Sequence, residues 1–250
     1  MAKGQTFQAT VLKKTQVTPH MLRVSVGGEG LKEFPEDQPG AYFKLVFPGQ
    51  EGEKDRLRTY TVRQQFDDSF DIDFMVHEAD GGLAISWAMA AQPGDTIQIR
   101  GPGPNKTVDP EADWFLFAGD MTALPAISAN IQRLPADAKG YAVLEVVDEA
   151  DRQQLNAPAG IEIKWIVNDQ PGVNSDCLVE AVKDLPWAEG RPGVWCACEF
   201  SSMRKLRDYF RNERGVDKSD LYISSYWKLG REEEAHKKLK REDNEAAAQA

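Results

Sequence analysis

The stretch Arg58-Thr59-Tyr60-Thr61-Val62-Arg63 decides how this chain is interpreted. It has the composition of a β-strand, in which residues two apart share a face. We therefore expect Arg58, Tyr60 and Val62 on one face of the strand and the other three residues on the opposite face. A cation, an aromatic ring and hydroxyl groups on one short strand suit a ligand that is part phosphate and part flat heterocycle.

Short strand-like segments surround this stretch throughout the first hundred residues. They are rich in β-branched and aromatic residues, with Pro and Gly between them, and cover residues 7–12, 21–26, 41–47, 58–63, 69–76 and 96–100. Only residues 83–91 have a helical composition. Six short strands favour a small antiparallel barrel, because a closed barrel leaves no long unpaired edge.

Beyond the Pro-, Gly- and Asp-rich residues 102–113 the periodicity changes. Residues 114–118 form a continuous apolar run that predicts a strand buried on both faces, and 141–147, 161–167 and 194–197 repeat it. Helical segments are predicted at 123–133, 177–183 and 202–214, and alternation of strand and helix predicts a parallel sheet with right-handed crossovers. The predicted domains are a barrel over 1–107, an α/β domain over 108–230 and a charged helical tail over 231–250.

The predicted tail carries glutamates four residues before lysines, as in Glu233–Lys237 and Glu234–Lys238. This spacing favours a solvated helix. Few of its residues are apolar, so we expect most of its surface to stay exposed to water. A lid or a partner-binding role for the tail stays open beside this interpretation.

Composition excludes several classes of function. The net charge of −10 argues against nucleic-acid or anionic-membrane binding, and no apolar run approaches the roughly 20 residues of a membrane span. The amino terminus lacks the apolar core of a signal peptide, and the three cysteines are too few for a disulfide framework. The three histidines are widely separated, which gives no metal-ligand spacing. We expect a soluble, cytoplasmic monomer without a bound metal.

Several motifs along the chain go beyond a general two-domain plan. They are Arg58-x-Tyr60-Thr61-x-Arg63, His77 with a Gly-rich turn leading to Trp87-Ala88, Pro93-Gly94-Asp95, Gly101-Pro102-x-Pro104, Gly119-Asp120-x-Thr122, Ala197-x-Glu199, Arg204-x-x-Arg207 and Tyr226-Trp227. With them the chain, up to about Gly230, resembles the siderophore-interacting protein family of flavin-dependent ferric-siderophore reductases. The resemblance implies a ferredoxin-reductase-like fold, with an FAD-binding barrel followed by an NAD(P)H-binding α/β domain.

The resemblance also implies roles for single residues. Arg58 is expected to hold the FAD phosphates, Tyr60 to stack on the isoalloxazine and Thr61 to contact its reactive edge near N5, so Tyr60 and Thr61 are the expected catalytic residues. The remaining expected flavin contacts are Val62, Arg63, His77, Gly82, Leu83, Ala84 and Ser86. Physical chemistry supports the Gly82-Leu83-Ala84 element by itself, because a helix start offers unpaired N–H groups and partial positive charge to a pyrophosphate.

The second domain is expected to hold the nicotinamide dinucleotide. Asp120 and Thr122 follow the first buried strand, at the carboxyl edge where open sheets bind ligands, and Glu199 ends a later strand. No Gly-x-Gly-x-x-Gly motif is present there. Glu145 and Asp148 lie near the end of the next strand, where a carboxylate accepts ribose hydroxyls and repels a 2′-phosphate, so we expect NADH to be preferred over NADPH.

The implied reaction passes electrons from NADH through FAD to a ferric siderophore, whose iron is released as Fe(II). Many ferric siderophores are anionic, so basic residues are expected to bind them. Lys44 is the first choice, followed by Arg133, Lys228 and Arg231. Two alternatives stay open: a general flavin or ferric-chelate reductase, and a flavin-bearing protein that binds a siderophore without turnover.

Overall fold

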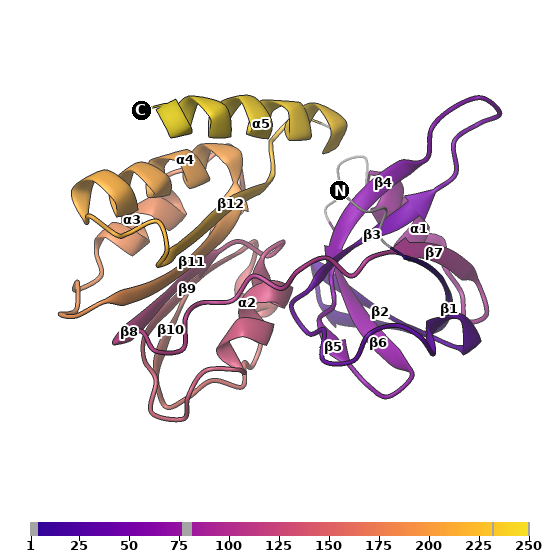
Figure 1. The fold of residues 1–250 in the computed structure, drawn as a ribbon, viewed down its shortest axis with the longest axis horizontal. Coiled ribbons are helices and arrows are strands. Elements are labelled where there is room, and N and C mark those ends of the chain that lie inside the picture. Colours follow the sequence, from indigo (N-terminus) through magenta and orange to yellow (C-terminus); the bar gives the residue numbers. More distant parts are fainter. Residues whose placement is uncertain (1–4, 77–81, 232, 250) are drawn as a thin grey trace. The chain divides into compact units, whose positions relative to one another are not determined.

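The computed structural model describes residues 5–76, 82–231 and 233–249, which form two compact units (Figure 1). The first unit combines Met1–Lys106 with Pro125–Arg133 and Ala150–Asn156. The second combines Thr107–Leu124, Leu134–Glu149 and Ala157–Ala250. His77, one of the expected flavin contacts, lies outside the described residues.

The first unit is built on a curled antiparallel sheet in the order β4-β3-β7-β1-β2-β6-β5. Its elements are β1 (Thr6–Thr18), β2 (Met21–Gly27), η1 (Glu29–Leu31), β3 (Tyr42–Phe47), β4 (Arg56–Thr61), β5 (Gln64–Gln65), β6 (Ser69–Met75), α1 (Leu83–Ala90) and β7 (Thr96–Arg100). The sheet curls back on itself just after β4, where the Arg63 N–H donates to the Asp71 carbonyl at 2.8 Å.

The predicted antiparallel architecture of this unit is confirmed, but it has seven strands where six were expected. The additional strand is β5, which consists of two glutamines and pairs with β6. Two polar residues carry no alternation of apolar and polar side chains, so the sequence pattern could not reveal it. The interior is apolar as expected: Ala9, Phe43, Leu45 and Phe74 are fully buried.

The second unit contains a five-stranded, all-parallel sheet in the order β10-β9-β8-β11-β12. Its strands are β8 (Trp114–Gly119), β9 (Lys139–Val146), β10 (Gly160–Val167), β11 (Pro192–Glu199) and β12 (Leu221–Trp227). The helical elements of this half of the chain are α2 (Leu124–Ile131), η2 (Glu149–Asp151), α3 (Cys177–Lys183), α4 (Phe200–Asp208), the π-helical turn η3 (Tyr209–Glu213) and α5 (Glu233–Gln249). The predicted parallel sheet is confirmed, and every residue of β8 is buried.

The sequence did not predict β12, because Ser224 and Ser225 interrupt its apolar pattern. Both serines are buried, and each hydroxyl has a hydrogen-bond partner. Ser225 Oγ lies 2.9 Å from His236 Nε2, and Lys240 Nζ donates to Ser224 Oγ at 2.6 Å. Buried polar groups are costly unless they are hydrogen-bonded, and α5 supplies both partners.

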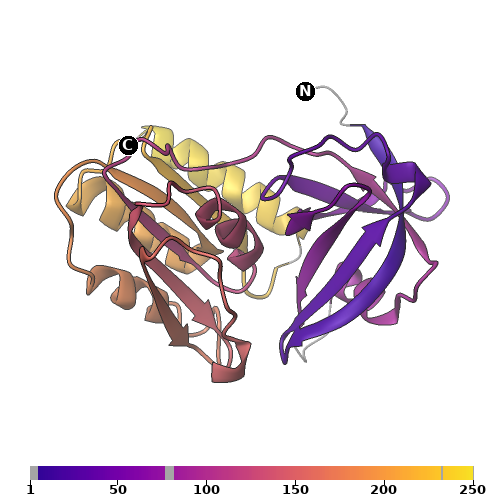
Figure 2. The same cartoon turned by 90° about the horizontal axis from the view of Figure 1, so that it is seen from below.

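Helix α5 corresponds to the predicted charged tail, and Figures 1 and 2 show it lying along α4 and β12. Most of its side chains are exposed, as expected, but His236 is buried. The predicted pair of Glu233 with Lys237 forms at 2.7 Å. Lys238 lies 4.0 Å from Glu242, and its predicted pairing with Glu234 stays a prediction. The helix is therefore anchored to the second unit.

Within the described residues, no helix combines the length and the apolar character that crossing a membrane requires. The same residues contain no group of three or more His, Cys, Asp or Glu side chains that could hold a metal ion. The three cysteines carry free thiols.

Candidate functional site

Strand β4 places Arg58 and Tyr60 on the interior face of the curled sheet. In its antiparallel pairing with β3, Tyr60 lies opposite Phe43 and Arg58 opposite Leu45, and both partners are fully buried. The Tyr60 ring packs on Phe74, with centroids 4.4 Å apart and an interplanar angle of 41°. Tyr60 itself is half-buried, so part of this residue stays accessible to a ligand.

The alternation expected along residues 58–63 ends at Thr61, because the strand ends there. Thr61, Val62 and Arg63 are all buried. The backbone of Val62 is bonded on both sides: its N–H donates to Ala41 at 2.9 Å and its carbonyl accepts from Gly40 at 2.8 Å. Val62 therefore secures the end of β4 within the unit, and its contact with a cofactor stays a prediction.

Arg63, which follows β4, belongs to a buried ionic cluster with Arg23 of β2 and Asp73 of β6. Arg23 donates to Asp73 at 2.6 and 2.8 Å, and Arg63 Nε lies 3.7 Å from the same carboxylate. Burial lowers the pKa of the Arg63 guanidinium, and Asp73 opposes this effect. Its Nε and Nη1 atoms are buried without a hydrogen-bond partner among the described residues.

Helix α1 packs against the same hydrophobic cluster as Tyr60. The Trp87 ring of α1 lies 6.0 Å from Phe74, on the same aromatic cluster. The helix starts at Gly82 without a side-chain cap and without an acidic residue in its first turn. The first N–H groups of an uncapped helix are available to an anion. An arginine, a half-buried aromatic ring and this helix start together fit a ligand with a pyrophosphate and a flat ring system.

The carboxyl edge of the parallel sheet is organised around Asp120, which is 5% exposed. Its carboxylate accepts from the Thr122 N–H at 2.9 Å and the Thr122 hydroxyl at 2.5 Å. It also accepts from Trp227 Nε1 at 2.8 Å and from the Glu199 N–H at 3.0 Å. Burial raises the pKa of Asp120, and these hydrogen bonds oppose the rise. Asp120 thus ties the ends of β8, β11 and β12 together.

Glu199 is equally fixed by its neighbours. It is the N-cap of α4, where its carboxylate accepts from the Ser201 N–H, and it also accepts from the Leu229 N–H at 3.3 Å. Lys228 Nζ lies 3.1 Å from Glu199 and donates to the Ser201 hydroxyl at 2.8 Å. The sequence did not reveal these bonds or the one from Trp227 to Asp120, which joins residues 107 positions apart.

Glu145 lies near the end of β9, beside β8. It is 8% exposed, and burial raises its pKa to about 7. A hydrogen bond from Asn168 lowers this value, and the charges of Asp120 and Glu199 raise it further. Asp148, the other carboxylate expected near the ribose, is exposed. Three expected cofactor residues, Asp120, Glu145 and Glu199, therefore share one sheet edge.

The four basic residues expected to bind substrate are divided between the units. In the first unit, Lys44 Nζ lies 3.4 Å from Thr59 Oγ1, on the face of β4 opposite Tyr60, and Arg133 pairs with Asp37 at 2.7 Å. In the second unit, Lys228 pairs with Glu199, and Arg231 is exposed.

Both halves of the chain match family models of known proteins. Residues 112–230 match the family model described as siderophore-interacting protein, and residues 10–57 and 50–106 match the siderophore-interacting FAD-binding domain. The chain is 38% identical over 247 residues to the ferric vibriobactin reductase ViuB of Vibrio cholerae, with 90% of each chain covered.

Solved structures are similar to this chain in fold. The siderophore-interacting protein SipS from Aeromonas hydrophila is 32% identical, has a TM-score of 0.87, and the match covers 97% of this chain and 99% of SipS. Ferredoxin-NADP+ reductase from Plasmodium falciparum, at 11% identity and a TM-score of 0.63 over 89% of this chain and 97% of its own, shares the fold alone. The expected ferredoxin-reductase-like fold is thereby confirmed.

Proposed function

Because this chain belongs to the siderophore-interacting protein family, we propose that it is a ferric-siderophore reductase. Electrons pass from NADH through FAD to an Fe(III)-siderophore, and iron leaves as Fe(II) for assimilation. The observation that carries the proposal is that the half-buried Tyr60 shares strand β4 with Arg58 and a hydrophobic cluster with the uncapped helix α1, in a chain that this family matches in both halves. One NADH supplies two electrons and therefore reduces two ferric ions.

The first unit supplies the binding of FAD. Arg58 holds its phosphates, the N–H groups at the start of α1 bind the same anionic part, and the exposed part of Tyr60 packs on the flat ring system. FAD, when bound, supplies the chemistry that connects a two-electron donor to a one-electron acceptor. The protein orients the cofactor. The Tyr60 ring is held in place by Phe74, whose ring centroid lies 4.4 Å from that of Tyr60.

The second unit supplies the binding of the nicotinamide dinucleotide, at the edge organised by Asp120. Asp120 and Glu199 already accept hydrogen bonds from the protein, so they fix the positions of the strand ends that form this edge. Glu145 is the carboxylate that receives the ribose hydroxyls, and its negative charge disfavours a 2′-phosphate. NADH is accordingly the preferred donor.

This assignment predicts a pH-dependent cofactor preference. Glu145 is neutral below about pH 7 and ionised above it, so its repulsion of a 2′-phosphate grows as pH rises. The ratio of kcat/KM for NADH to that for NADPH should rise about fivefold from about pH 6 to about pH 8, which corresponds to about 1 kcal/mol of added repulsion. Steady-state kinetics with both donors measures it.

The control for this prediction is Glu145→Gln, which cannot ionise. The 2′-phosphate also titrates near neutral pH, and the part of the rise due to the cofactor alone should persist in this variant. A ratio that changes equally in both proteins, or a preference for NADPH in the parent protein, contradicts the role of Glu145.

Basic side chains receive the anionic siderophore. Lys44 is the first choice: it lies on β3 across from Thr59, on the face of β4 opposite Tyr60, and would contact the siderophore rather than the flavin ring. Replacing Lys44 by Ala should raise the half-saturating concentration of ferric siderophore about 3- to 10-fold, the loss of one charge contact, and leave flavin reduction by NADH unchanged. Lys13→Ala removes the same charge from an exposed position on β1 and should change neither quantity. Equal siderophore dependence in the two variants would remove Lys44 from the site.

Capture of released iron tests the proposed activity. The protein, supplied with FAD and NADH, should form Fe(II) from a ferric siderophore, and a coloured ferrous chelator reports the amount. Equal rates with ferric citrate and other simple chelates would indicate a general ferric-chelate reductase. Tight siderophore binding without Fe(II) formation would indicate a binding protein.

A further inference from the structure

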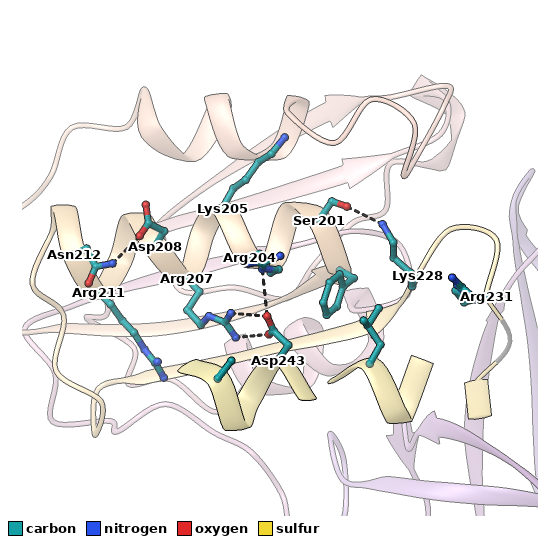
Figure 3. Close-up of a pocket in the computed structure, with 13 residues that line it drawn as sticks. Ser201, Arg204, Lys205, Arg207, Asp208, Arg211, Asn212, Lys228, Arg231 and Asp243 are labelled. Carbon is teal, nitrogen blue, oxygen red and sulfur yellow. Dashed lines mark hydrogen bonds and ion pairs between the residues drawn. The ribbon is translucent and has the colours of Figure 1, made fainter. Parts of the chain in front are cut away.

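A basic groove lies in the second unit, between α5 and the continuous helix formed by α4 and η3 (Figure 3). Its volume is about 1160 Å³. Six cationic side chains and two carboxylates line it, namely Arg204, Lys205, Arg207, Arg211, Lys228, Arg231, Asp208 and Asp243. The lining therefore has a formal charge of +4 in a chain whose net charge is −10. Such local concentration of charge attracts anions in spite of the overall charge.

Three arginines form a row along this groove. Arg204, Arg207 and Arg211 are spaced i, i+3 and i+7, so they share one face of the helix over about 10 Å. The protein already places an oxyanion on this row: Asp243 of α5 accepts from Arg207 at 2.6 and 3.0 Å and lies 3.2 Å from Arg204 Nε (Figure 3). The row is therefore shaped to bind oxyanions.

Arg211 ends the row and differs from the other two. It lies in the π-helical turn η3, a rare element that is frequent at functional sites. Its Nε is buried and has no hydrogen-bond partner among the described residues. The neighbouring Asp208 carboxylate accepts instead from Asn212, at 2.6 Å. The rest of the Arg211 side chain is half-exposed and lines the groove, so its terminal N–H groups are the donors that a ligand oxygen can reach.

We propose that the groove between α4 and α5 binds a phosphate-bearing small molecule with at least two anionic groups. Arg211 is the main anchor, Arg204 and Arg207 bind the second anionic group, and Asp243 is an internal competitor. A row of about 10 Å exceeds the reach of a single phosphate, and guanidinium groups match phosphate oxygens in pairs. One end of the groove, at Ser201 and Lys228, adjoins Glu199 of the nucleotide edge, and the arginine row extends along α4 beyond its first turn, away from that edge.

Calorimetric titration of the full chain with inorganic pyrophosphate, in buffer of low ionic strength, tests the proposal. Saturable binding with one site is expected. Arg211→Gln should weaken it about tenfold or more, because a charged donor is lost. Lys218→Gln, which removes the same charge from an exposed position outside the groove, should leave it unchanged. Asp243→Asn should tighten it, since the competing carboxylate is gone.

Each opposite result overturns the proposal. The proposal is wrong if pyrophosphate does not bind saturably, if Arg211→Gln binds it as tightly as the parent protein, or if Asp243→Asn binds it more weakly. It is also wrong if citrate binds and pyrophosphate does not, or if NADH displaces pyrophosphate. Circular dichroism of each variant confirms that it is folded. The titration involves no turnover, so its outcome is independent of the proposed reductase activity.

Discussion

Replacing Tyr60 by alanine is expected to weaken FAD binding about 10- to 100-fold, because stacking of a heterocycle on an aromatic ring contributes about 1–3 kcal/mol. The purified variant should contain little flavin and should show little NADH-dependent reduction of ferric siderophore. Equilibrium titration of the flavin-free protein with FAD measures the change in Kd.

The control variant is Tyr60→Phe, which retains the ring that packs on Phe74 and should bind FAD within a few-fold of the parent protein. Removing the ring also removes an aromatic pair that contributes about 1 kcal/mol to folding, so thermal unfolding is recorded for both variants. If Tyr60→Ala is folded and binds FAD as tightly as the parent protein, Tyr60 does not contact the flavin.

The second large effect is expected at Asp120. Asp120→Ala leaves the part-buried Trp227 indole N–H and the buried Glu199 N–H without an acceptor, and each such loss costs about 1–3 kcal/mol. Part of this cost is offset because a buried carboxylate is itself unfavourable. We expect the free energy of unfolding to fall by about 2–4 kcal/mol and KM for NADH to rise, because the edge loses its shape.

Chemical denaturation measures the free energy of unfolding, and steady-state kinetics measures KM for NADH. Asp217→Ala makes the same substitution at an exposed position before β12 and should change neither stability nor KM. Asp120→Asn keeps one acceptor oxygen and should lie between the parent and the alanine variant. A stability loss in Asp120→Ala no larger than that of Asp217→Ala would contradict the role of Asp120 as the tie between three strands.

The fold could be predicted where apolar pattern and burial coincide. The run from Trp114 became β8, and the antiparallel strands were found from their β-branched and aromatic residues. The pattern failed at β5, which has two polar residues, and at β12, whose serines are buried only because α5 bonds them. The partners of those serines lie on a helix that the sequence marks mainly by its charge.

The strand that carries the expected flavin contacts could be predicted, because the motif from Arg58 to Arg63 is local, and the contacts themselves stay a prediction. The electrostatics of the site could not be predicted, because they depend on residues distant in the sequence. The pKa of about 7 at Glu145 arises from burial and from the charges of Asp120, which follows the neighbouring strand β8, and of Glu199, which ends β11 on the far side of β8. The basic groove is another example, since Asp243 meets Arg204 and Arg207 only when α5 lies along α4.

The central claim is that this chain transfers electrons from NADH to a ferric siderophore through FAD. The most direct measurement follows the flavin absorbance of the FAD-loaded protein in the absence of oxygen. We expect NADH to bleach the flavin, and a ferric siderophore then to restore its colour with two Fe(II) ions formed for each NADH consumed. A flavin that stays oxidised with NADH and NADPH, or a reduced flavin that the ferric siderophore does not reoxidise, would contradict the claim.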